Sequence, residues 1–204
     1  MKKCLAVVAA VLLALPSPAR AQVRRTDLNL ALGQLDIAVR SLPPVASLPR
    51  IRAAVTWLTD RAATSDPALI TQEYVRSLTQ LAELLRTVRR SEVIDDVAEE
   101  LEAKVEHCRR LGIGMGGSVR LNVNTRRGGQ TVAEWQVFYM LKVYEHVKGA
   151  APVVFPTLST PTEAVLEPGR YWLWARDPAT GRTSERALVR VIGETQLRLD
   201  LPVP

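Results

Sequence analysis

The spacing of apolar residues along the chain changes character partway through the sequence. Between Asp27 and Leu111, apolar residues recur every three or four positions, which is the period of an α-helix that buries one face. Pro43-Pro44, Ser65 and Ser91 interrupt this pattern, and residues of these types are typical of helix ends and starts. We therefore predict four helices, with apolar stripes over residues 28–42, 51–62, 70–88 and 94–108.

The links between these helices are short, which favours antiparallel neighbours. Asp66 followed by Pro67 is expected to start the third helix, because an Asp side chain can cap free amides and Pro lacks the hydrogen that would be unpaired there. The spacing of three and four is typical of bundle packing, but two of the helices are also long enough to pair with a second protomer. An intramolecular bundle and a helix-mediated homodimer both remain open.

After Gly112 the apolar residues alternate with polar ones, which is the period of a β-strand. Residues 119–123 alternate strictly, and residues 133–143 form a nearly uninterrupted apolar run that we predict to be one long strand. Turn residues at 167–169, 177–181 and 192–194 separate the later strands. We predict an α+β fold: a helical domain over 22–111, a glycine hinge over 112–117, and a seven-stranded antiparallel β-sandwich over 118–204.

The second half also carries a recognisable succession of turn and strand. The run from Glu167 to Ala175, then Gly181, then 189–191 and 197–199, resembles the carboxypeptidase regulatory-like and transthyretin-like sandwich domains. Those domains share a proline-glycine turn, a tyrosine-bearing strand and a closing hairpin rich in Val and Leu. The resemblance covers about residues 118–203 and implies a non-catalytic accessory or adhesion module, with no ligand-binding residues to carry over. The helical half has no such resemblance.

The first 21 residues have the pattern of a secretory signal. Lys2 and Lys3 precede an apolar run over 5–15, and Ala19-Arg20-Ala21 supplies the small-x-small cleavage pattern. The run is too short to cross a bilayer, and no later apolar stretch is long enough. We therefore expect cleavage before Gln22 and a periplasmic or extracellular protein without a stable membrane span.

The charge and the cysteine content limit which partners and which disulfides we expect. Removal of Lys2, Lys3 and Arg20 lowers the formal charge from +6 to +3, and the basic residues alternate with acids, so we expect no nucleic-acid partner. Cys4 leaves with the signal, so Cys108 has no partner for an intramolecular disulfide. Cys108 is then a buried apolar residue, an intermolecular disulfide or a reactive thiol.

Catalytic patterns are weak throughout the sequence. Gly112, Gly114 and Gly117 fit G-x-G-x-x-G, but a helix precedes and a strand follows, the reverse of a dinucleotide site. His107 has Lys104 where a di-metal site needs Glu, and His146 is expected at the surface without a second ligand. We therefore predict no catalytic, cofactor or metal residues. The acidic residues of the fourth helix are interpreted as a solvated face: Asp95, Asp96, Glu99, Glu100, Glu102 and Glu106.

Aromatic residues are concentrated in the second half and suggest a binding surface. If Tyr171, Leu173 and Ala175 point into the sandwich, Trp172 and Trp174 lie together on its outer face. They could anchor a protein interface or stack on sugar rings, or the protein's own helices could cover them.

We therefore predict an exported, non-enzymatic interaction or accessory module whose partner is an envelope protein. The alternative is a module that binds wall polysaccharide through Trp172, Trp174 and Trp135. An unrecognised hydrolase is the third hypothesis.

Overall fold

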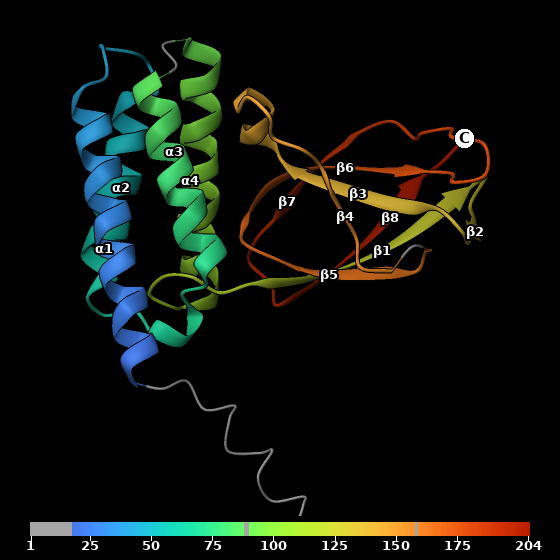
Figure 1. Ribbon diagram of the computed structural model, residues 1–204, viewed down its shortest axis with the longest axis horizontal. Helices are drawn as coiled ribbons and strands as arrows, with labels where there is room; N and C mark the ends of the chain where they lie inside the picture. Colours follow the sequence, from blue (N-terminus) through green and yellow to red (C-terminus); the bar gives the residue numbers. More distant parts are fainter. Residues whose placement is uncertain (1–17, 88–89, 158) are drawn as a thin grey trace, which may run out of the picture.

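The computed structural model describes residues 18–87, 90–157 and 159–204, with side chains from residue 25 onward. Within these ranges, four α-helices precede eight strands (Figure 1), so the predicted α+β class is confirmed. Most of the predicted signal sequence, residues 1–17, lies outside the described residues. Among the residues described, no helix has the length and apolar character needed to cross a membrane.

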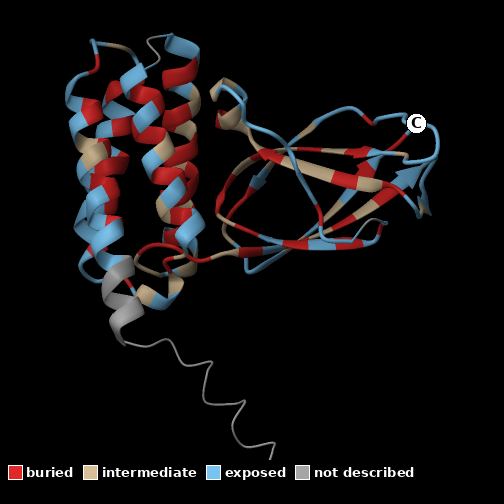
Figure 2. Cartoon of the chain, viewed as in Figure 1, coloured by how far each residue is buried: buried red, intermediate tan, exposed pale blue. Residues whose placement is uncertain are grey.

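The helices bury the apolar stripes that their sequences predict. They are α1 (Pro18–Arg40), α2 (Leu48–Ala62), α3 (Gln72–Thr87) and α4 (Ser91–Leu111). Helix α1 packs against α2 and α3, and α2 packs against α4, so one apolar core lies among them. Figure 2 shows this core as the buried inner faces of the four helices.

The third helix begins later than its start signal predicts. Asp66 caps a short 3-10 turn, η1 (Pro67–Leu69), by accepting a hydrogen bond from the Ala68 amide at 2.8 Å. Ile70 is extended and fully buried, and the Thr71 hydroxyl then accepts from the Tyr74 amide at 3.0 Å. Thr71 therefore makes the cap that starts α3, because it satisfies one of the free amides of the first turn.

The glycine segment after α4 is closely packed. Gly112 takes the left-handed conformation that commonly ends a helix (φ 65°), and its amide donates to the Arg109 and Cys108 carbonyl oxygens. The Gly117 amide donates to the Leu69 carbonyl oxygen at 2.8 Å, and a Cβ on Gly116 would lie 2.1 Å from that oxygen. These contacts fix the segment against η1; its role as a hinge stays a prediction.

The strands form two four-stranded sheets. In the first, β1 (Val119–Arg127) pairs with β2 (Gln130–Val132), β5 (Thr162–Leu166) and β8 (Gln196–Pro202). The second has the order β4 (Val153–Val154), β3 (Gln136–Leu141), β6 (Gly169–Arg176) and β7 (Ala187–Val191). The prediction of seven antiparallel strands needs correction in two respects, since eight strands are described and β1 pairs with β8 in parallel.

The two sheets share one apolar core, to which inward residues such as Leu121 of β1 and Leu173 of β6 contribute. The predicted strand over 133–143 is shorter than expected. Glu134 has a positive φ of 69°, which keeps it out of the ladder, and after Leu141 the chain forms the 3-10 turn η2 (Lys142–His146). Val143 joins the helical core instead of the sheet, because η2 packs against α4.

Helix α4 connects the two parts of the molecule. It contacts β6 and η2, so one end of the sheet part lies against the helices (Figure 1). The opposite end, with the C-terminus, points away from them. The junction between α4, β6 and η2 is therefore where residues distant in sequence meet.

Candidate functional site

The outer side of the second sheet carries a group of aromatic, apolar and basic side chains. The strand register places Phe138 opposite Trp174, and Leu188 opposite Trp172. The residues between them on β6, including Leu173, are buried in the core, as the alternation predicts. We call this surface the aromatic face, and it consists of Phe138, Trp172, Trp174, Arg186 and Leu188.

Trp174 is held between two neighbours on the aromatic face. Its ring stacks on Phe138, with ring centroids 5.7 Å apart and planes 9° from parallel. The Arg186 guanidinium carbon lies 4.8 Å from the centroid of the indole ring. Because β6 lies between β3 and β7, these two groups approach the indole from opposite sides. The indole is therefore pre-positioned, and it is partly exposed.

Trp172 lies at the end of the aromatic face nearest the helices. Its indole Nε1 donates a hydrogen bond to Glu145 Oε2 of η2 at 3.0 Å. Leu188, its neighbour across the strands, is 43% exposed. Leu188 also lines a groove with Arg50 of α2 and Glu102 of α4, so the helices border this end of the aromatic face, which is partly accessible.

Trp135, the third predicted surface tryptophan, has a different position. It is only 4% exposed and packs in the sheet core, with the Arg127 guanidinium 5.9 Å from its ring centroid. It does not join Trp172 and Trp174. Phe138 was missed because the apolar run that contains it shows no alternation, and Arg186 was missed because nothing local distinguishes it from other surface arginines.

Three polar residues of α4 are buried at the junction. Glu100, Lys104 and His107 lie about one turn apart and are at most 1% exposed. Lys104 Nζ donates to the Pro168 carbonyl oxygen at 2.9 Å and lies 3.4 Å from Glu100 Oε1. Glu100 Oε2 accepts from the Arg170 amide at 2.9 Å. The predicted solvated face is therefore wrong for Glu100. The sheet part satisfies its Oε2, whereas its Oε1 has only the ion-pair contact with Lys104 and no hydrogen bond among the described residues.

Burial shifts the pKa values of Glu100 and His107 and of the neighbouring Cys108. It raises the pKa of Glu100, an effect that Lys104 opposes. Burial lowers the pKa of His107 to about 4, and Lys104 adds to that effect. His107 Nδ1 accepts from the Gly193 amide at 3.1 Å, which leaves the proton of the neutral ring on Nε2. Burial raises the pKa of the Cys108 thiol to about 11, so this cysteine is a core residue rather than a nucleophile.

A second charged cluster brings together Asp96, Glu145 and His146, whose ligand atoms all lie within 4.8 Å of one another. Lys142 Nζ lies 2.6 Å from Asp96 Oδ2 and 3.0 Å from Glu145 Oε1, and Arg170 also faces Asp96. Although burial raises the pKa of Asp96, hydrogen bonds from His146 and Lys142 hold it below its usual value. Lys142 therefore pairs with both carboxyl groups that a metal ion at this cluster would need. His146, expected at the surface, is instead half-buried against Asp96.

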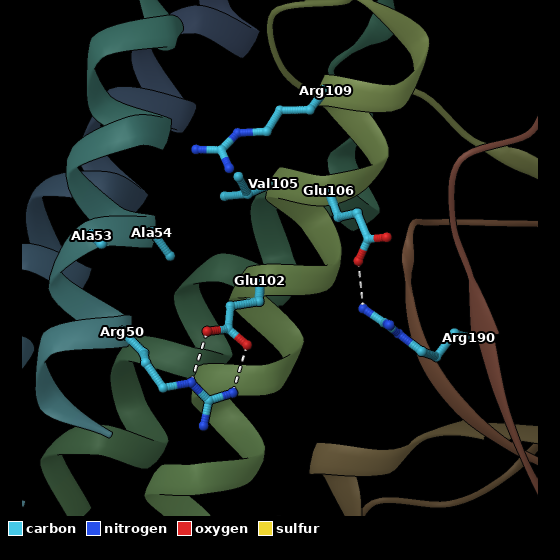
Figure 3. A pocket seen from close by; sticks show the side chains of 8 residues that line it. All are labelled: Arg50, Ala53, Ala54, Glu102, Val105, Glu106, Arg109 and Arg190. Carbon is cyan, nitrogen blue, oxygen red and sulfur yellow. Dashed lines mark hydrogen bonds and ion pairs between the residues drawn. The ribbon is translucent and has the colours of Figure 1, made fainter. Parts of the chain in front are cut away.

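A groove of about 530 Å³ between α2, α4 and β7 is lined in part by arginines. Figure 3 shows the side chains that line it. Arg50 makes two hydrogen bonds to Glu102, at 2.8 and 2.6 Å, and Arg190 makes one to Glu106 at 2.7 Å. Arg109 reaches toward α2, where its guanidinium carbon lies 5.3 Å from the Trp57 ring centroid. The charges of Arg50 and Arg190 are therefore paired with carboxylates of α4, whereas Arg109 packs against an aromatic ring.

A further cavity, of about 350 Å³, lies between α3, η2 and the sheets. Its walls are mainly apolar and aromatic.

No family model matches the sequence, and no curated protein is detectably similar to it.

Proposed function

We propose that this protein is an exported, non-enzymatic interaction module that docks an envelope protein through its aromatic face. The observation that carries the proposal is the stack of Phe138, Trp174 and Arg186, which holds a large aromatic side chain in a fixed position on an accessible sheet. Trp and Arg are the residue types that most often dominate the binding energy of protein interfaces. A pre-positioned anchor also loses little side-chain entropy on binding.

The geometry of Trp174 favours a protein partner over a polysaccharide. A sugar ring stacks on an open face of an indole, and here Phe138 and Arg186 flank both faces. A protein side chain can instead pack against Leu188, which is exposed beside the partly exposed Trp174. Binding of wall polysaccharide through Trp172 and Trp174 stays the alternative, and it requires Arg186 to move away.

The finer fold assignment is part of this proposal. We infer that the sheet part is a β-sandwich of the regulatory-like kind and that the helical part is a four-helix bundle. Two sheets around one shared core, and four helices around another, support this.

The charged groups at the junction support a non-enzymatic function. Glu100 and Lys104 are paired with each other and with the backbone of the sheet part, and Asp96 is paired with Lys142 and His146. Among the described residues, these clusters join the two parts of the molecule rather than line an open cleft. Their role in the proposal is structural.

The test is site-specific photocrosslinking in the cell envelope. A photoreactive amino acid at position 188 should capture a discrete protein, and the purified partner should then bind the mature chain in a titration. Arg186→Glu and Trp174→Leu should each weaken that binding at least tenfold. Arg182→Glu is the matched control, because Arg182 is an exposed arginine of the same β6–β7 connection but lies outside the aromatic face.

Two outcomes would overturn the proposal. The first is equal binding by the Arg186→Glu and Arg182→Glu variants, which would remove the aromatic face from the interface. The second is a change of tryptophan fluorescence on titration with wall polysaccharide, lost in Trp172→Ala, which would favour the alternative. Sequencing of the mature N-terminus tests export separately, and a chain that retains residues 1–21 would contradict it.

A further inference from the structure

The cavity between α3 and the sheets, which we call the junction pocket, has the features of a small-molecule site. Its volume of about 350 Å³ lies within the usual range of about 300 to 1,000 Å³ for such sites. Tyr139 and Tyr144 contribute aromatic surface, while Leu141 and Leu166 contribute aliphatic surface. The walls come from both parts of the chain, and ligand sites often lie at such boundaries.

Two valines at this pocket are unusually exposed. Val153 of β4 is 49% exposed and Val165 of β5 is 63% exposed. They come from different sheets, yet both line the same pocket. Neither belongs to the aromatic face. An apolar ligand in the pocket would remove part of both side chains from water, which is favourable in proportion to the area covered.

The charged groups that line the pocket are the carboxyls of Glu73 and Glu167 and the guanidinium of Arg76. Glu167 is largely buried, and its Oε1 accepts a hydrogen bond from the Thr71 hydroxyl. Its Oε2 is buried and has no hydrogen-bond partner among the described residues. Buried carboxylate oxygens normally have a donor, so Glu167 is an acceptor that lacks one. Glu73, on the same side of the pocket, adds a second carboxyl group.

We propose that the junction pocket binds a small apolar molecule that carries one ammonium group, with Glu167 as the acceptor of its N–H bond. The tyrosine rings add to this preference, since the faces of aromatic rings attract cations. The apolar body of the ligand would lie against Val153 and Val165. This site does not depend on the aromatic face, so either proposal can fail without the other.

The cations nearest the pocket do not favour an anionic ligand. Arg76 lines it but is exposed on α3, where water solvates its charge. Lys104 is engaged, because its ammonium group bonds to the Pro168 carbonyl oxygen and pairs with Glu100. A carboxylate ligand next to Glu167 would be repelled by that side chain, whereas Glu73 adds little because it is exposed to water like Arg76.

The test is isothermal titration of the mature protein with three probes of similar shape: phenethylamine, 2-phenylethanol and 3-phenylpropionate. Phenethylamine should bind at least tenfold more tightly than either of the others. Glu167→Gln should weaken its binding about tenfold or more, as expected for the loss of a hydrogen bond between charged groups. Glu163→Gln is the matched control, since Glu163 is an exposed carboxyl of β5 that does not line the pocket.

A second pair of variants locates the site even if Glu167→Gln impairs folding. Ala151→Trp should block the pocket and abolish binding, because Ala151 is exposed and lines it. Ala150→Trp should leave binding unchanged, because this neighbour is exposed outside the pocket. The proposal is overturned if 3-phenylpropionate binds as tightly as phenethylamine, if both tryptophan variants behave alike, or if phenethylamine does not bind at millimolar concentration.

Discussion

Lys104, fully buried on α4, donates a hydrogen bond from Nζ to the carbonyl oxygen of Pro168 at 2.9 Å and so ties the helical part to the sheet part. The same ammonium group lies 3.4 Å from Glu100 Oε1 and 5.0 Å from the centroid of the Tyr74 ring. A single buried cation therefore contacts an acidic side chain, an aromatic ring and a distant main-chain oxygen. Its removal should affect the whole junction.

Replacement of Lys104 by methionine should destabilise the protein by about 3 kcal/mol or more, because it leaves Glu100 as a buried charge without its partner. Urea denaturation monitored by circular dichroism measures the change. Glu100→Gln combined with Lys104→Met should recover more than half of the loss, since the charge is then removed as well. A single variant within 1 kcal/mol of wild type would show that the ion pair contributes little.

His107 should make stability depend on pH in the acid range. Its pKa is lowered from an ordinary value of 6.5 to about 4 by burial, so the unfolded chain binds a proton more readily than the folded one. The contribution of neutral His107 to the free energy of unfolding is fully present above pH 6.5 and is lost as the pH falls toward 4. It amounts to about 3 kcal/mol at 1.36 kcal/mol per pKa unit.

The measurement for His107 is the free energy of unfolding of wild type and His107→Gln at several pH values. The difference between the two proteins should change through the window from 6.5 to 4 and stay constant above it. The comparison with the variant cancels the opposite contribution of buried carboxyls such as Glu100, whose raised pKa stabilises the fold as the pH falls. A difference that does not vary with pH would contradict the assignment.

Two glycines should respond differently to the same substitution. Gly116→Ala places a Cβ 2.1 Å from the Leu69 carbonyl oxygen at a φ of 86°, so both a clash and a strained backbone result. Gly128→Ala meets no atom within 4 Å and suffers only the strain of its φ of 56°. We expect a loss of about 1 kcal/mol for Gly128→Ala and at least twice that for Gly116→Ala, measured by thermal unfolding. Equal losses of stability would mean that the glycine segment can move away from Leu69 at little cost in free energy.

Cys108 should be inert to thiol reagents in the folded protein. Its thiol is fully buried, donates to the Gly116 carbonyl oxygen at 3.8 Å, and has a pKa raised to about 11. Labelling with a chromogenic disulfide reagent at pH 8 should be slow until denaturant is added, because only the thiolate reacts. Fast labelling of the native protein would instead support the reactive-thiol hypothesis.

Local pattern was sufficient for most of the secondary structure. Helix α4 runs from Ser91 to Leu111 and ends at Gly112, as the stop signals indicate. The alternation over 119–123 and at Leu173 predicts which residues face the core. The local pattern was insufficient where a remote contact changes the course of the chain. At η2, Lys142 pairs with Asp96 of α4, and the apolar run leaves the sheet there.

The aromatic face was partly predictable. Trp172 and Trp174 are separated by one residue on a strand, so they share a side of the sheet whatever lies next to it. Their neighbours were not predictable, because Phe138 and Arg186 reach Trp174 only through the strand register. The position of Trp135 was also not predictable, because Glu134, which precedes it, has a positive φ that breaks the alternation.

The sequence by itself determined the elements of this protein, because helix and strand periods, caps and turns depend on residues within a few positions of one another. Only the tertiary structure decided which polar residues are buried. Glu100, Lys104 and His107 show the charged pattern of a solvated helix face, yet their partners at Arg170, Pro168 and Gly193 lie more than 60 residues away. Burial of a polar side chain is costly unless partners satisfy at least part of it, and the positions of these partners follow from how the sheet part packs on α4.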